Sequence, residues 1–102
     1  MDKDLDNDFY QFSNNTFNNL IFKDVDTSKV TYMNKMFFGC SALTSLDFSG
    51  WDTSNVIDMS YVFYNCNALK TIRMVGCSQT TIDKIKAQLS TDGITGCTIV
   101  TE

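Results

Sequence analysis

Residues 26–51 read DTSKVTYMNKMFFGCSALTSLDFSGW, and residues 52–77 read DTSNVIDMSYVFYNCNALKTIRMVGC. The second segment repeats the first at a fixed step along the chain, which we call one repeat length. The identical pairs are Asp26/Asp52, Thr27/Thr53, Ser28/Ser54, Val30/Val56, Met33/Met59, Phe37/Phe63, Cys40/Cys66, Ala42/Ala68, Leu43/Leu69 and Gly50/Gly76. A period of this length is typical of a solenoid, in which each unit buries its apolar face against its neighbours. We call 26–51 the first repeat and 52–77 the second repeat.

Each repeat ends in an alternating apolar pattern that predicts a short strand. The pattern is Leu43-x-x-Leu46-x-Phe48 in the first repeat and Leu69-x-x-Ile72-x-Met74 in the second. Alternation places one face of a strand in the core. Strands that recur once in every repeat stack as a parallel ladder, and the residues between them cross over the back of the solenoid. We therefore predict an α/β solenoid with a parallel sheet of about four strands.

The crossovers carry apolar residues at spacings of three and four, which predicts a short helix in each. Asn34 and Ser60 are suitable N-cap residues for helices of one or two turns, and Ser28 and Ser54 are the alternative caps. The Asp-Thr-Ser segment that opens each repeat is typical of a turn in either case.

The flanking residues complete a single domain, 1–102. Residues 1–8 form a charged end, and the segment 9–25 is expected to be a partial N-terminal repeat, because Phe17, Leu20 and Phe22 lie one repeat length before Leu43, Leu46 and Phe48. Residues 78–102 are expected to form a C-terminal cap. Within it, 80–89 predicts a helix in the third crossover slot, opened by a capping box of Thr80 and Asp83, and 97–101 predicts a last strand.

The composition restricts the classes of function. The chain has 102 residues, is 43% hydrophobic and carries a net charge of −4, with no basic stripe, so nucleic acid is not an expected partner. No apolar run reaches the roughly 20 residues of a membrane span, so we expect no membrane insertion. The opening Met-Asp-Lys-Asp is not that of a secretory signal. The chain has no histidine, and no nucleophile–base pair stands out, so we expect no enzyme.

The cysteines lack the spacing of a metal site. The four of them include no C-x-x-C pair, so we expect no metal and no cofactor. Cys40 and Cys66 share a repeat position and are predicted to be free buried thiols. Whether Cys77 and Cys97 pair in an oxidising compartment stays open. Calcium at the stacked Asp26 and Asp52 is the alternative to turn hydrogen bonds, which we favour.

The combination Cys-x-x-Leu-x-x-Leu-x-Phe and Trp-Asp-Thr-Ser-x-Val-x-x-Met-x-x-Met-Phe resembles the BspA-like bacterial surface leucine-rich repeat family, over residues 17–77. The resemblance implies a leucine-rich-repeat-like solenoid. It also implies a protein that is displayed on a cell surface or secreted and that serves adhesion or protein binding. This chain differs from the family in having two full repeats where members often have many.

The candidate binding residues follow from strand alternation. If the apolar residues point inward, their neighbours form three columns on the exposed sheet face. These columns are Asn19/Ser45/Thr71, Ile21/Asp47/Arg73 and Lys23/Ser49/Val75. The rival surface is an aromatic patch on the crossover side, formed by Tyr32, Phe38, Tyr61 and Tyr64.

These observations lead to two hypotheses of function. The first is a non-catalytic module that binds a protein or glycan partner through the sheet face. The second is a structural segment that caps a longer array or joins subunits of an assembly. The sequence specifies neither the partner nor the oligomeric state.

Overall fold

The computed structural model describes residues 14, 16–22 and 27–102. The predicted charged end, 1–8, and the first half of the partial repeat lie outside the described residues. The described chain forms a parallel sheet of four strands in the order β1-β2-β3-β4, and one helix, α1. The elements are β1 (Asn19–Ile21), β2 (Ser45–Asp47), β3 (Thr71–Arg73), α1 (Gln79–Thr91) and β4 (Thr98–Val100). This α/β architecture confirms the predicted fold class.

The strand register follows the repeat in the sequence. Leu20 pairs with Leu46, and Leu46 pairs with Ile72, each a step of one repeat length. Ile72 then pairs with Ile99, so the last step is slightly longer than the repeat. Leu46 and Ile72 are buried while their neighbours face outward, which is the arrangement that alternation predicts.

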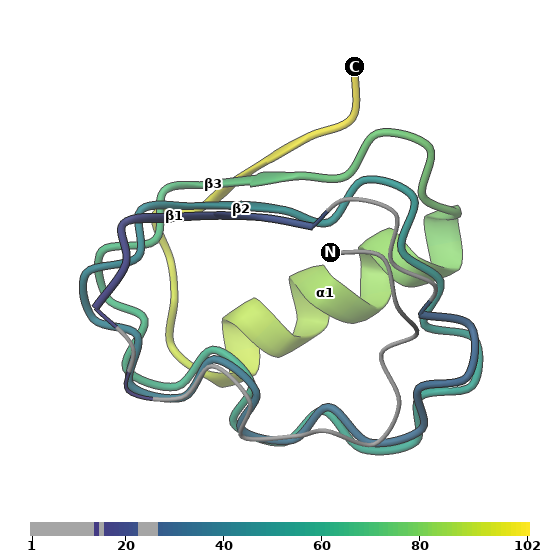
Figure 1. The fold of residues 1–102 in the computed structure, drawn as a ribbon, viewed down its shortest axis with the longest axis horizontal. Coiled ribbons are helices and arrows are strands. Elements are labelled where there is room, and N and C mark those ends of the chain that lie inside the picture. The colour runs from purple at the N-terminus through teal and green to yellow at the C-terminus, as the bar shows by residue number, and fades with distance from the viewer. Residues whose placement is uncertain (1–13, 15, 23–26) are drawn as a thin grey trace.

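Successive repeats stack closely enough to share backbone hydrogen bonds around the whole circuit. Viewed down the stack, the two full repeats nearly superpose (Figure 1). Beyond the strands, the Phe48 amide donates to the Arg73 carbonyl at 2.7 Å, and the Gly50 amide donates to the Val75 carbonyl at 2.9 Å. On the crossover side the Phe37 amide donates to the Val62 carbonyl at 3.1 Å. Each repeat therefore satisfies many of its polar backbone groups with those of its neighbour.

The crossovers are chains of tight turns, and the prediction of short helices there was wrong. Within the first repeat, amides donate three residues back, as from Phe38 to the Lys35 carbonyl at 3.2 Å. Lys35 and its counterpart Tyr61 have positive φ angles of 61° and 60°, which a right-handed helix does not tolerate. The amides that a helix would use internally donate instead to the next repeat, as from Lys35 to the Ser60 carbonyl at 3.0 Å. Contact between repeats therefore overrides the local helical spacing.

Helix α1 occupies the third crossover slot, as predicted, and begins one residue earlier than the predicted helix. The predicted capping box of Thr80 and Asp83 is not the cap. Ser78 is the N-cap, and its Oγ accepts a hydrogen bond from the Thr81 amide at 3.2 Å. The buried face of the helix carries Ile82, Ile85 and Leu89, the three residues expected there. The strand β4 confirms the predicted last strand.

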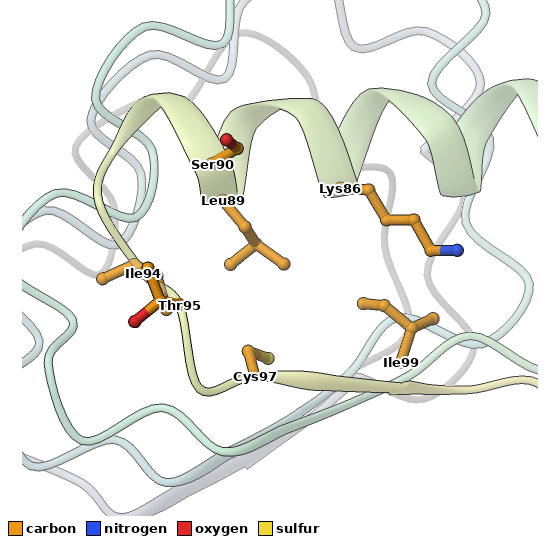
Figure 2. Close-up of a pocket in the computed structure, with 7 residues that line it drawn as sticks. All are labelled: Lys86, Leu89, Ser90, Ile94, Thr95, Cys97 and Ile99. Carbon is orange, nitrogen blue, oxygen red and sulfur yellow. The ribbon is translucent and has the colours of Figure 1, made fainter.

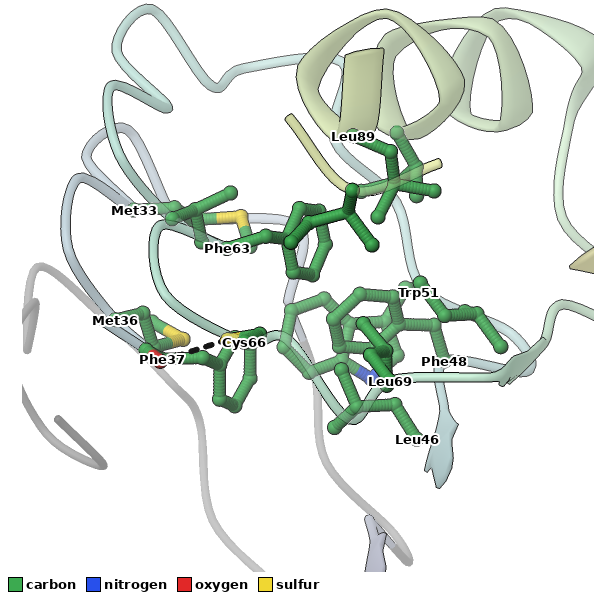
Figure 3. Close-up of a cluster of buried hydrophobic side chains, with 14 of the residues drawn as sticks. Met33, Met36, Phe37, Leu46, Phe48, Trp51, Phe63, Cys66, Leu69 and Leu89 are labelled. Carbon is green, nitrogen blue, oxygen red and sulfur yellow. Dashed lines mark hydrogen bonds between the residues drawn. The ribbon is translucent and has the colours of Figure 1, made fainter. Parts of the chain in front are cut away.

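The core lies between the sheet and the crossovers. Phe37 and Phe63 stack at 6.3 Å between ring centroids with an interplanar angle of 8°, and Phe48 lies 5.7 Å from Phe37. Figure 3 shows these rings with Trp51, and with Leu89 of α1, which belongs to the same buried cluster. Phe22 of the partial repeat packs on the same cluster, 4.9 Å from the Trp51 ring. One aromatic core thus connects the partial repeat, both full repeats and the cap.

Candidate functional site

The first predicted column runs straight across the sheet. Asn19, Ser45 and Thr71 are direct neighbours on β1, β2 and β3, and β4 extends the row with Thr98. The Ser45 hydroxyl donates to the Asn19 side-chain oxygen at 3.1 Å. These short polar side chains are exposed or half-buried, so the column is open to solvent.

In the second column an ion pair lies between two apolar residues, one on each edge strand of the sheet. Ile21, Asp47 and Arg73 are neighbours, and Val100 follows on β4. Arg73 Nε lies 3.9 Å from Asp47 Oδ2, and the Arg73 side chain is 52% exposed. A cross-strand pair of this kind contributes about 0.2–1 kcal/mol. Asp47 Oδ1 accepts from the Ser49 amide at 2.9 Å, which fixes the carboxylate at the end of β2.

The third column is only partly available for binding. The Ser49 hydroxyl accepts a hydrogen bond from the Val75 amide at 3.0 Å, so it holds two repeats together. Val75 itself is half-buried, and Lys23 lies outside the described residues. The first two columns are therefore the accessible part of the predicted surface.

Three rings of the aromatic patch on the crossover side contact one another in a row. Phe38 and Tyr64 stack at 5.5 Å with an angle of 20°, and Tyr61 meets Tyr64 edge to face at 5.5 Å and 88°. Tyr61 is 51% exposed, and Tyr32 and Tyr64 are also exposed. Lys35 Nζ lies 5.6 Å from the centre of the Phe38 ring, at cation–π distance.

None of the four cysteines forms a disulfide, and the two that share a repeat position are fully buried, as predicted. The Cys66 thiol donates to the Phe37 carbonyl at 3.1 Å, as Figure 3 shows. Burial, with a smaller contribution from the neighbouring Cys40, raises the pKa of Cys66 to about 12. Burial also raises the pKa of Cys77 and of Cys97. A raised pKa disfavours the thiolate, so these are not activated nucleophiles.

The raised pKa of Cys66 predicts a loss of stability in alkali. In the unfolded chain this thiol ionises near its ordinary pKa of about 8.5, whereas in the folded protein it stays protonated up to about pH 12. Its contribution is therefore fully present below about pH 8.5 and is lost as the pH rises toward 12. Urea unfolding at pH 8, 9 and 10 should show a steeper decline for the wild type than for Cys66→Ala. If the stability of the wild type and of Cys66→Ala declined in parallel, the raised pKa of Cys66 would be contradicted.

The acidic turns bind their own backbone. Asp52 Oδ1 accepts a hydrogen bond from the Ser54 amide at 2.9 Å, which is the turn arrangement that we favoured over calcium. Asp26 lies outside the described residues. Within the described ranges, no three His, Cys, Asp or Glu side chains gather as a metal site would require.

The structure contains a cavity of about 440 Å³ at the C-terminal end of the stack, between α1 and β4. We call it the end cavity; the residues that line it are Lys86, Leu89, Ser90, Ile94, Thr95, Cys97 and Ile99. In Figure 2 the Leu89 and Cys97 side chains point toward one another across it, and the Lys86 side chain extends toward Ile99. Its walls mix the apolar side chains with those of Lys86, Ser90 and Thr95. The described part of the chain contains no helix long and apolar enough to cross a membrane.

A line of buried hydroxyl groups was not predicted from the sequence. Thr27, Thr53 and Thr81 are all at least 96% buried. The Thr27 hydroxyl accepts from the Asp52 amide at 2.9 Å, and the Thr81 hydroxyl accepts from the Thr53 amide at 3.3 Å. The signal present in the repeat was the identity of Thr27 and Thr53, which recur at the same position of each unit.

Residues 3–87 match the profile of a family described as "Mycoplasma protein of unknown function, DUF285". No curated protein and no solved structure gives a significant match to the chain.

Proposed function

The chain belongs to the family DUF285, whose description assigns no activity, and we propose that it is a non-catalytic binding module. In this proposal, the outer face of the sheet contacts a protein or glycan partner. The observation that carries the proposal is the alignment of two open columns across four strands in register. We define this sheet face by its central residues Ser45, Asp47, Thr71 and Arg73.

The rigidity of the sheet face favours binding. Hydrogen bonds between repeats hold β2 and β3 on both sides of the strands, as at Lys70 to Thr44 (2.9 Å) and Phe48 to Arg73 (2.7 Å). Side chains on such a scaffold lose little further conformational entropy when a partner binds. The face also offers mixed chemistry, with hydroxyl groups, an ion pair and the 55% exposed side chain of Ile21. Mixed surfaces of this kind are typical of non-obligate interfaces.

The resemblance of residues 17–77 to BspA-like surface repeats favours the same assignment. In that family the repeats serve adhesion or protein binding. We therefore also propose that the protein is displayed on a bacterial cell surface or secreted.

A photo-crosslinking experiment tests the sheet face directly. A photoreactive amino acid replaces Ile21 in one variant and Ile57, which is 74% exposed, in a control variant. Both are mixed with biotinylated surface proteins from bacterial and host cells. We expect a discrete crosslinked product from position 21 that is absent from position 57, and we expect Arg73→Glu to reduce it. Equal labelling from both positions, or no effect of the charge reversal, would contradict the proposal.

The end cavity supports the second candidate, a segment that joins an assembly. Leu89, Ile94 and Ile99 line it, and β4 beside it is at the edge of the sheet. An edge strand next to apolar side chains is a surface on which another chain can pair. Sedimentation velocity discriminates between the candidates: a monomer across the micromolar range favours the binding module, whereas association that Ile99→Asp abolishes favours assembly.

A further inference from the structure

A second cavity lies on the crossover side, away from the sheet face. Its volume is about 240 Å³, and the residues that line it are Ser60, Tyr61, Tyr64, Gln88, Thr91 and Asp92. The first three belong to the turns of the second repeat, and the others belong to the C-terminal end of α1. We call it the tyrosine cavity. It is smaller than the roughly 300–1,000 Å³ of most small-molecule pockets, so it suits a single head group.

The electrostatics of the tyrosine cavity favour a cation. Among the residues that the structure describes, Asp92 is the charged one in the lining, and no lysine or arginine lines the cavity. The Asp92 carboxylate accepts from the Phe63 amide at 2.9 Å and from Gln88 Nε2 at 3.0 Å, and both donors are neutral. These bonds hold the carboxylate in place without cancelling its charge. The last turn of α1 carries no basic residue, and the C-terminus of a helix has a partial negative charge of its own.

The repeat shows what the aromatic rings can bind. In the first repeat, the chain supplies a cation to the patch itself, because Lys35 Nζ lies 5.6 Å from the centre of the Phe38 ring. One repeat later the lysine is replaced by Tyr61 and the ring by Tyr64. The backbone is conserved between the two positions, with φ of 61° at Lys35 and 60° at Tyr61. The second repeat thus keeps the ring, adds a second one at 88° to it, and supplies no cation of its own to the cavity.

We propose that the tyrosine cavity binds an organic cation, the ammonium or guanidinium head of a ligand. The head group contacts the rings of Tyr61 and Tyr64, which attract it through their π-electrons, and Asp92 provides the counter-charge. The same positive charge is presented by a lysine or arginine side chain of a polypeptide and by a small quaternary ammonium compound such as choline. This site is separate from the sheet face, so the failure of one proposal does not affect the other.

Titration of the labelled protein with matched ligands tests the cation requirement. The NMR spectrum of the backbone amides is recorded as each of three ligands is added. These are choline, its neutral isostere 3,3-dimethylbutan-1-ol and N-acetyl-lysine methylamide. We expect the two cations to shift the Phe63 amide, which donates to Asp92, and the neutral alcohol to bind at least about fivefold more weakly. Tighter binding of the lysine derivative indicates a polypeptide ligand, and tighter binding of choline indicates a small quaternary ammonium ligand. Equal binding of the neutral alcohol, or no shift with either cation, would overturn the proposal.

Three variants locate the site. Tyr61→Lys reproduces the arrangement of Lys35 and Phe38, so the chain fills the site with its own ammonium group, and a lysine already adopts this φ at position 35. Asp92→Asn removes the counter-charge. We expect each to weaken choline binding at least about fivefold. Asp83→Asn is the matched control, because it removes the same charge from an exposed position within α1, whereas Asp92 directly follows that helix. Unchanged binding in the first two variants, or equal weakening in the control, would show that the cavity is not the site.

Discussion

Phe63→Ala is expected to lower the free energy of unfolding by about 3–5 kcal/mol, the usual cost of a buried Phe-to-Ala change. The Phe63 side chain is fully buried. Its ring stacks on Phe37 of the first repeat at 6.3 Å and lies 6.3 Å from the Phe48 ring. Leu89 of α1 belongs to the same cluster of buried side chains, which Figure 3 shows. The ring therefore connects three parts of the stack, and its loss leaves a cavity that none of them can close without moving the others.

Urea unfolding measures the loss, and Tyr64→Ala is the control in the same turn. Tyr64 is 42% exposed, and its ring contacts Phe38 and Tyr61 at the surface, so its removal should cost about 0.5–1.5 kcal/mol. A loss below about 1 kcal/mol for Phe63→Ala, or a larger loss at Tyr64, would show that the repeat is in a different register.

The repeat made the fold largely predictable from the sequence. Each position that recurs and is apolar also packs, so Leu46 and Ile72 identify the strands, and the step of one repeat length identifies which of them pair. The same step placed Ile82, Ile85 and Leu89 of the helix against the core. Two of the three columns on the sheet face followed from alternation alone.

The crossovers were mispredicted because their structure depends on contact between repeats. A spacing of three and four residues fits a helix as well as a series of turns, and only the neighbouring repeat decides where the amides donate. The Phe37 amide donates to Val62 in the next repeat, which local propensity cannot show. Position 61 illustrates the same limit, because a positive φ at a tyrosine has no signal in the residue type.

The tyrosine cavity was only half predictable. The exposed rings of Tyr61 and Tyr64 were expected from the repeat. Asp92 was not, since it belongs to the cap and reaches back to the Phe63 amide in the second repeat. The repeat pattern ends where the cap begins. It therefore gives no information about the side chains that the cap contributes to the tyrosine cavity.

Thr81→Val is expected to lower the free energy of unfolding by about 2–4 kcal/mol although it keeps the size and branching of the side chain. The Thr81 hydroxyl, 2% exposed, lies 3.3 Å from the Thr53 amide and 3.1 Å from the Thr53 hydroxyl. Valine leaves these two buried groups without that partner, and each unsatisfied group costs about 1–3 kcal/mol. Thr80→Val makes the same chemical change one residue earlier, at an exposed position, and should cost no more than about 0.5 kcal/mol.

The double variant Thr53→Val/Thr81→Val separates the two contributions. Replacing both hydroxyl groups by methyl groups removes the unsatisfied hydroxyl, since paired polar groups can be exchanged for apolar ones at little cost. The Thr53 amide stays unsatisfied, so part of the loss remains. We therefore expect a loss for the double variant that is smaller than the sum of the single variants and larger than zero. Additive losses in urea unfolding would mean that the two hydroxyls do not interact, and that the cap is held to the second repeat by apolar contacts and Lys84, whose Nζ donates to the Thr53 carbonyl at 2.7 Å.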